Sequence, residues 1–284
     1  MKIEFLLRLL LKIFVYGAIF VFVVSGYLFF TSIRPPRFVS PWTPADFGLR
    51  YEEVTLRTKD GINLKAWYVP AEGANRAIIL CHGYPADKGN IIGLGRILHP
   101  AYNLLFFDFR GMGTSGGNVT TVGFREVEDL AAAIDYVQLR GIRKIGVYGF
   151  SMGGAVALMA EDPRVRAVVS ESAFASLNLI IDDIYKKFGV CKYPFILATK
   201  IYARLFLGVD VSGISALQSI ARRQIPILLM HSERDSQIPV RHAAMLHRAN
   251  PATLLWIIPG ADHGENLDQQ EYRDRITKFF AENL

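Results

Sequence analysis

Six short apolar runs between residues 76 and 259 place the strongest constraint on how this chain folds. Each run is about as long as one strand and carries few polar residues, which is typical of strands buried on both faces of a parallel sheet. Segments with apolar residues at helical spacing separate the runs. We therefore predict an α/β protein with a mostly parallel sheet and helices on both faces. The runs are residues 76–81, 102–108, 144–149, 165–170, 225–231 and 253–259.

The residues ahead of these runs predict an antiparallel start to the sheet. Residues 51–58 and 62–70 alternate polar and apolar side chains on either side of a turn sequence, Lys-Asp-Gly at 59–61. This pattern predicts a β-hairpin, which brings the expected sheet to eight strands. Residues 122–141 carry apolar side chains at helical spacing and predict a helix that ends at Gly141.

One region breaks the alternation of strand and helix. Residues 174–223 have no good strand pattern, but apolar and aromatic residues recur at helical spacing in 177–188, 194–207 and 214–221. We predict that this region is a helical insertion that acts as a cap over one end of the sheet. The alternative is an ordinary crossover between two strands.

The N-terminal region predicts a membrane anchor. Residues 13–33 contain no charged side chain and are apolar on all sides. About 20 such residues in a helix cross a hydrocarbon core of about 30 Å, so we assign residues 1–33 to an anchor helix. A cleaved signal peptide fits less well, because the run is long and no clear small-x-small cleavage site precedes the prolines at 35 and 36. A buried core helix is the other alternative.

The charges around this run predict its orientation. The basic residues that flank it are Lys2, Arg8 and Lys12 before the run, and Arg34 and Arg37 after it. By the positive-inside rule this slight excess puts the N-terminus in the cytoplasm and the main domain outside it. Residues 34–50 are rich in proline and predict a linker or a packed segment, and residues 51–284 then form the α/β domain.

Composition excludes several classes of protein. Hydrophobic residues make up 51% of the chain and aromatic residues 12%, which excludes a disordered protein. The net charge is +6, but the chain has no long basic run and no zinc-finger spacing, so we expect no nucleic-acid partner. Cys81 and Cys191 form neither a disulfide framework nor a metal cluster. We expect no metal and no cofactor.

A Gly-x-Ser-x-Gly sequence follows the apolar run at 144–149. In an open parallel sheet, ligands bind beyond the carboxyl ends of the strands, which is where this sequence falls. Gly149 and Gly153 allow a very sharp strand-to-helix turn, because side chains there would collide with the backbone nearby. The turn lifts the hydroxyl of Ser151 clear of the sheet, beside the N-terminus of the next helix. We predict that Ser151 is a nucleophile.

A serine nucleophile needs a base, and the base needs a group to orient it. Asp235 follows the run at 225–231 and His263 follows the run at 253–259, so both fall at carboxyl ends of predicted strands. We predict His263 as the general base and Asp235 as its orienting acid. Asp262 cannot readily face the imidazole of the adjacent residue, and Glu233 is the alternative acid.

Two backbone N–H groups are candidates for an oxyanion hole. One belongs to Met152, which follows the nucleophile, and the other to Tyr84, which follows a His-Gly turn at 82–83. We expect His82 to make a structural hydrogen bond rather than to catalyse. We also expect Asp108 and Arg110 to form a structural pair near the site.

Together these motifs resemble the α/β-hydrolase fold family. The chain is most similar to its membrane-anchored ABHD13/BEM46-type members and to serine-aminopeptidase-like hydrolases, over about residues 51–284. The stretch "DFRGMGTSGG" at 108–117 resembles the Asp-x-Arg-Gly-x-Gly-x-Ser loop of that group. The resemblance implies Ser151 as nucleophile, His263 as base and Asp235 as acid, and it puts the oxyanion-hole position on Tyr84.

The sequence therefore predicts a membrane-anchored serine hydrolase. The anchor and the apolar 174–223 region favour an ester or thioester substrate with a hydrophobic acyl group, either a small molecule or a lipid. The alternatives are a serine peptidase of the aminopeptidase-like kind, an acyltransferase, and a catalytically inactive membrane-tethered binding protein. The acyl length, the leaving group and the oligomeric state stay open.

Overall fold

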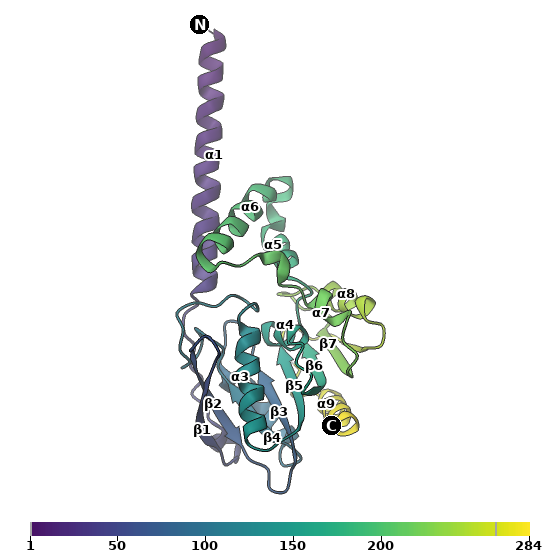
Figure 1. The fold of residues 1–284 in the computed structure, drawn as a ribbon. Helices are drawn as coiled ribbons and strands as arrows, with labels where there is room; N and C mark the ends of the chain where they lie inside the picture. Colours follow the sequence, from purple (N-terminus) through teal and green to yellow (C-terminus); the bar gives the residue numbers. More distant parts are fainter. Residues whose placement is uncertain (1, 265) are drawn as a thin grey trace.

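The described residues form one eight-stranded sheet in a computed structural model that describes residues 2–264 and 266–284 (Figure 1). The strand order is β1-β2-β4-β3-β5-β6-β7-β8. This is the mostly parallel eight-stranded sheet that the six apolar runs and the hairpin pattern together predict. The strands are β1 (Glu52–Arg57), β2 (Asn63–Val69), β3 (Arg76–Cys81), β4 (Asn103–Phe107), β5 (Lys144–Phe150), β6 (Val165–Glu171), β7 (Ile227–Ser232) and β8 (Leu254–Ile258).

The antiparallel part of the sheet lies at one edge. β1 and β2 form the predicted hairpin, with Val54 opposite Ala66, and β2 then pairs antiparallel with β4. The pairs from β4 through β3, β5, β6 and β7 to β8 are parallel. Their carboxyl ends therefore meet at one edge of the sheet, which is where ligands bind in open parallel sheets.

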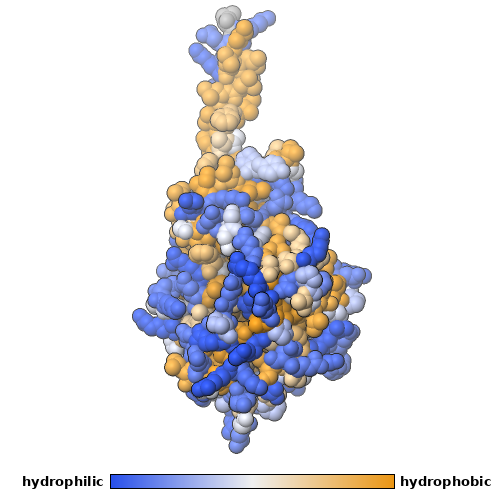
Figure 2. Space-filling model, turned by 45° about the vertical axis from the view of Figure 1, so that its right-hand side comes forward, coloured by the Kyte–Doolittle hydropathy of each residue, from blue (hydrophilic) through white to orange (hydrophobic). Residues whose placement is uncertain are grey.

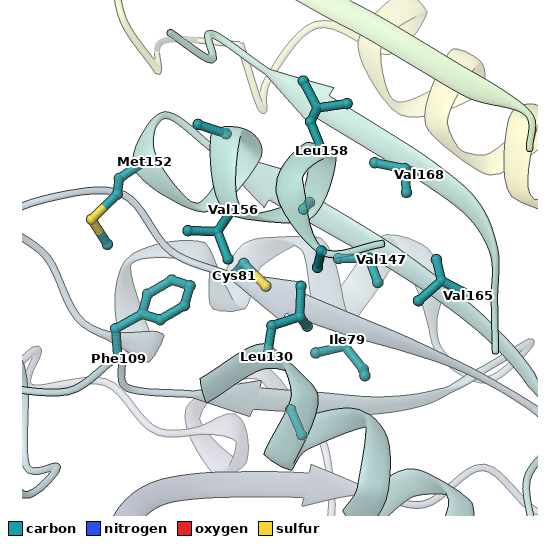
Figure 3. Packing of buried hydrophobic residues seen from close by; sticks show 14 of the residues in the cluster. Ile79, Cys81, Phe109, Leu130, Val147, Met152, Val156, Leu158, Val165 and Val168 are labelled. Carbon is teal, nitrogen blue, oxygen red and sulfur yellow. The ribbon is translucent and has the colours of Figure 1, made fainter. Parts of the chain in front are cut away.

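Helices cover both faces of the sheet, because successive strand residues point to opposite sides. On one face Ile79 and Val147 pack against α3 (Glu126–Leu139), α4 (Met152–Met159), α7 (Ala216–Ile220) and α8 (Arg241–Ala249). Figure 3 shows Cys81 and Val147 beside Leu130 of α3 and Val156 of α4. On the other face Ile78 and Leu80 pack with α2 (Gly95–Leu98) and α9 (Gln270–Asn283). Both clusters are closed to water, so the sheet is a rigid support for the loops at its edge.

The first of the predicted helices begins later than its apolar spacing indicates. α3 starts at Glu126, not at residue 122. The Glu126 carboxylate accepts hydrogen bonds from the backbone N–H groups of Thr121 and Gly123, and the φ angles of Val122 and Gly123 are 50° and 113°. This hydrogen-bonded loop replaces the first helical turn, because its residues lie in the left-handed region.

Between β6 and β7 the chain runs through helices that stand beyond the sheet on the side of α4 (Figure 1). They are α5 (Leu177–Tyr185), α6 (Lys192–Tyr202) and a π-helical turn at Ala203–Leu207, after which α7 returns to the face of the sheet. The helical patterns at 177–188, 194–207 and 214–221 correspond to α5, to α6 with the π-helical turn, and to α7, although α6 begins two residues before its pattern. A small third core forms where α5 and α6 meet the N-terminal helix, with Phe29, Ile181 and Phe195 among its members.

The N-terminal helix α1 (Lys2–Ile33) protrudes from the rest of the molecule (Figures 1 and 2). It has 32 residues, and its most apolar window has a mean hydropathy of 2.3 with 17% of that window buried. By length and composition it can therefore span a membrane. Its last turns pack on α6, where the ring of Tyr202 stacks on Phe29 and the Tyr202 hydroxyl donates to the Phe22 carbonyl.

The residues that follow α1 are a packed segment, which is one of the two forms that the sequence allowed for 34–50. The Arg37 guanidinium donates to the carbonyls of Gly113, Ser115 and Gly117. The backbone N–H of Ser40 donates to the Asp87 carboxylate at 2.7 Å. α1 is therefore fixed to the loops at the sheet edge.

Candidate active site

Ser151 occupies a strained turn at the carboxyl end of β5. Its φ and ψ are 54° and −117°, and it is the N-cap residue of α4. A non-glycine residue in such a conformation costs about 1–3 kcal/mol and persists only where the surroundings hold it in place. Here the Ser151 N–H donates to the Glu171 carbonyl at 2.8 Å. The side chain is largely buried, at 6% exposure.

The two motif glycines are required by close backbone contacts. A Cβ atom on Gly149 would lie 2.2 Å from the Gly153 carbonyl oxygen. A Cβ atom on Gly153 would lie 2.3 Å from the Cys81 carbonyl oxygen at the end of β3. Since backbone atoms cannot move aside as a flexible side chain can, only glycine fits at either position.

Asp235 and His263 form a hydrogen-bonded pair beyond β7 and β8. His263 Nδ1 lies 2.7 Å from Asp235 Oδ2, and both side chains are nearly buried. The other carboxylate oxygen accepts from the backbone N–H groups of Gln237 and Ile238. Burial would raise the pKa of Asp235, but the hydrogen bonds from His263 and Ile238 outweigh it and hold that pKa below its ordinary value. The carboxylate is therefore ionised at neutral pH and holds the imidazole with Nδ1 protonated.

The other two carboxylates considered as the acid are bound elsewhere. The Asp262 carboxylate accepts from the backbone N–H groups of Ser236 and His263, so it caps its own loop. The Glu233 carboxylate accepts from the backbone N–H of Gly260. Among the hydrogen bonds described for His263, the one between its imidazole and a carboxylate is made with Asp235.

Phe150 precedes Ser151 in the chain and contacts His263. The ring of His263 is 4.8 Å from the ring of Phe150, and a Cβ atom on Gly83 would lie 3.2 Å from Ser151 Cβ. His263, Phe150, Gly83 and Tyr84 line one cavity of about 410 Å³. Across the described residues no hydrogen bond joins the Ser151 hydroxyl to His263. Catalytic hydrogen bonds are often longer in a ligand-free site and shorten when substrate binds.

The two predicted oxyanion donors lie in different settings. Met152 is the first residue of α4, so its N–H is one of the four that a helix leaves without an internal partner. Tyr84 follows Gly83 in the cavity wall, and its hydroxyl donates to the carbonyl of Ser32 in α1 at 2.8 Å. The loop that carries Tyr84 is therefore tied directly to the N-terminal helix.

His82 has the structural role that the sequence predicts, whereas Asp108 and Arg110 do not pair with each other. His82 Nε2 accepts from the backbone N–H of Phe109 at 3.0 Å, and burial lowers the pKa of His82. The carboxylate of Asp108, the first residue of the 108–117 loop, instead binds Lys88 Nζ at 2.7 Å. Arg110 instead binds Asp129 of α3 at 2.6 Å. The expected pair is wrong because each side chain finds a buried partner from a different segment.

Glu171 is a residue of the cavity wall that the sequence did not single out. It ends β6 and is 1% exposed. Its carboxylate accepts from the hydroxyls of Tyr148 and Tyr272 and from the side-chain amide of Asn266. Burial and the nearby carboxylate raise the pKa of both tyrosines well above the ordinary value, so they stay protonated as donors. A carboxylate directly after a buried apolar run was the signal that could have found it.

A second cavity of about 230 Å³ lies on the other side of Tyr84. Its walls are almost wholly apolar and come from four parts of the chain: α1, the Tyr84 loop, residues 121–122 ahead of α3, and the 174–223 region. Phe29 and Ile33 of α1 line it together with Ile180 of α5 and Ile214. Among the described residues, no group of His, Cys, Asp and Glu side chains is arranged to hold a metal ion.

Comparison with known proteins identifies the fold. A family model described as the alpha/beta hydrolase fold matches residues 76–188. A solved esterase of Pyrococcus furiosus, Pf2001, superposes with a TM-score of 0.73 at 27% identity, over 89% of this chain and 98% of the esterase. The chain is an α/β-hydrolase-fold protein.

Relatives of this α/β-hydrolase-fold protein come from bacteria, fungi and a plant. Bem46 of Schizosaccharomyces pombe is 25% identical over 254 residues, which cover 85% of this chain and 80% of bem46. YfhR of Escherichia coli (strain K12) is 27% identical over 253 residues, 82% of this chain and 81% of YfhR. The Saccharomyces cerevisiae membrane protein YNL320W is 25% identical over 248 residues, 84% of this chain and 83% of YNL320W. The resemblance of the sequence to BEM46-type proteins is thus confirmed over most of the chain.

Proposed function

We propose that this α/β-hydrolase is a membrane-anchored serine hydrolase that cleaves an ester or thioester with a hydrophobic acyl group. The observation that carries the proposal is the left-handed backbone of Ser151 at the β5–α4 turn. This strained turn is the known position of the nucleophile in the fold. The Asp235–His263 pair beside the same Phe150 ring supplies a base that is already oriented.

In the proposed reaction the Ser151 hydroxyl attacks the acyl carbonyl while His263 Nε2 takes its proton. Asp235 keeps Nδ1 protonated and stabilises the imidazolium that forms. The N–H groups of Met152 and Tyr84 donate to the oxyanion of the tetrahedral intermediate. His263 then gives its proton to the leaving group, and an activated water molecule releases the acid from the acyl-enzyme.

The apolar cavity beyond Tyr84 supports the hydrophobic acyl group. It adjoins the cavity of His263, since Tyr84 lines both, and its lining carries almost no polar surface. At about 230 Å³ it is smaller than the pockets of about 300–1,000 Å³ that hold drug-sized ligands. We therefore expect an acyl chain of limited length. The apolar composition of α1 supports the membrane anchor. The charges that flank it support an orientation with the hydrolase domain outside the cytoplasm.

The test is hydrolysis of p-nitrophenyl esters of rising acyl length by the full chain in detergent. Ile180→Trp fills the apolar cavity and should lower kcat/KM for the longer esters while that for the acetate changes little. Ile201→Trp is the matched control, because Ile201 lines a separate groove on the outer side of α6. Equal activity of the two variants on every ester would contradict the acyl assignment. Cleavage of aminoacyl amides without cleavage of esters would replace the esterase by a peptidase.

A further inference from the structure

The outer surface of the 186–207 segment carries an apolar stripe that no described residue covers. Tyr193, Leu197, Ile201 and Leu205 follow one another at intervals of four, which places them on one side of a helix. All four are exposed, by 64%, 61%, 36% and 72%. Val190 and Phe206 extend this stripe at its two ends and are 83% and 58% exposed. An apolar surface of this kind is unusual on a protein that faces water.

The charges of the same segment all have one sign. Its charged residues are Lys186, Lys187, Lys192, Lys200 and Arg204, with no acidic residue among them. Lys192 is paired with Asp182 of α5 at 2.7 Å. Among the described residues no ion pair involves the other four. Basic residues beside an exposed apolar stripe are typical of helices that lie at an anionic membrane surface.

The position of the segment along α1 places it at the height of the membrane. Phe195 of α6 lies 6.2 Å from the ring of Phe20, and its carbonyl accepts from the Ser25 hydroxyl. Phe20 is thirteen residues before the end of α1, which corresponds to about 20 Å along the helix. A membrane that holds α1 therefore reaches α6 as well. Figure 2 shows apolar surface continuing from the protruding helix onto the adjoining part of the molecule.

The length of α1 and the charges together set the depth. The charge-free residues 13–33 of α1 are about as long as a hydrocarbon core of about 30 Å is thick, so α6, which contacts α1 at Phe20 and Ser25, lies at the depth of the acyl chains. Lys and Arg side chains are long enough to reach the headgroup phosphates while their stems stay in apolar surroundings. The apolar stripe therefore faces the acyl chains, and the basic residues extend from it toward the headgroups.

We propose that the 186–207 segment is a second membrane contact, which inserts its apolar stripe into the leaflet next to the hydrolase domain and binds anionic headgroups with its basic residues. This inference rests on the anchor role of α1 in the proposed function, but not on the chemistry of Ser151. It places the apolar cavity that Tyr84 lines beside the lipid, since α1 and α6 line both that cavity and the outer groove next to the segment.

Cys191 offers a native position for the test. It is exposed and lines the outer groove with Phe14 and Gly17 of α1, whereas Cys81 is fully buried and its burial raises the pKa of its thiol. The full chain is labelled at Cys191 with an NBD maleimide and reconstituted into phosphatidylcholine vesicles with or without phosphatidylglycerol. Quenching is measured with aqueous iodide and with lipids that carry a nitroxide on the acyl chain. The control is Leu139→Cys in a Cys191→Ser background, because Leu139 of α3 is 86% exposed on the hydrolase domain.

We expect the Cys191 probe to be quenched several-fold less by iodide than the Leu139 probe, and several-fold more by the lipid nitroxide. Lys186→Gln with Lys187→Gln should reduce the gain in lipid quenching that phosphatidylglycerol gives, whereas Lys278→Gln on α9 should not. Equal iodide quenching at the two positions overturns the proposal. Protection from iodide without lipid quenching also overturns it, because a protein such as a second copy then covers the stripe.

Carbonate extraction of the same vesicles separates this inference from the anchor. A chain that resists extraction but exposes its Cys191 probe to iodide keeps α1 as an anchor and excludes the second contact. A chain that carbonate removes has no spanning helix, and both claims then fail together.

Discussion

Replacing Glu171 by Gln tests how the cavity wall holds the loop of His263. The Glu171 carboxylate accepts from Tyr148 at 2.5 Å, from Tyr272 at 2.6 Å and from Asn266 at 2.8 Å. Asn266 lies three residues after His263, so this carboxylate ties the loop to the end of β6. Glutamine keeps one acceptor oxygen but has an NH₂ group in place of the other. This NH₂ group must then face at least one of the three donors named above.

The expected cost follows from these contacts. A hydrogen bond to a charged group contributes about 1.5–3 kcal/mol, so losing one and weakening two others should lower the free energy of unfolding by about 2–4 kcal/mol. For a domain of this size that corresponds to a Tm lower by about 5–15 °C. We also expect kcat to fall more than KM changes, because the loop that carries His263 loosens.

The assay is thermal unfolding of the full chain in detergent, followed by circular dichroism, with ester hydrolysis measured in parallel. The control is Glu282→Gln, the same chemical change at a side chain that is 61% exposed and lies 3.9 Å from Lys278. The control should alter stability by no more than about 0.5 kcal/mol. A Glu171→Gln protein with the Tm and kcat of the wild type would refute the reasoning.

Two further predictions concern the triad and its turn. Asp235→Asn should lower kcat about 10⁴-fold, because the imidazole loses its fixed tautomer. Because folding lowers the pKa of Asp235, the ionised carboxylate stabilises the folded protein fully above the unfolded-state pKa of about 3.9, and this stabilisation is lost as the pH falls below it. The difference in unfolding free energy between wild type and Asp235→Asn should therefore shrink below that pH. Gly153→Ala should lower the free energy of unfolding by about 1–3 kcal/mol, because the added Cβ would collide with the Cys81 carbonyl. The control is Gly213→Ala, where nothing lies within 4 Å of the added atom, and it should change stability little. Equal urea midpoints for the two variants would contradict the steric argument.

The sequence was informative where a signal is local. The apolar runs and the hairpin turn predict the strands closely, because the burial of a strand shows in its own residues. The pairing of Asp235 with His263 could be expected from their places after two strands, since the parallel order brings those ends together.

The partners of Asp108, Arg110 and Glu171 could not be predicted in this way. Lys88 reaches Asp108 from a loop twenty residues away, and the hydroxyl of Tyr272 reaches Glu171 from α9. No spacing rule connects such residues, because the sheet and its helices bring them together only after folding. The start of α3 was missed for a similar reason, since Glu126 bonds to the backbone of the preceding loop instead of extending the helix.

The most direct test of the central claim is labelling of the full chain with a fluorophosphonate, followed by peptide mass spectrometry. The account predicts one covalent adduct on Ser151, no labelling of Ser151→Ala, and a kcat for that variant about 10⁶-fold lower on the best ester. Wild-type hydrolysis by Ser151→Ala, or an adduct on a different serine, would show that the strained turn after β5 does not carry the nucleophile.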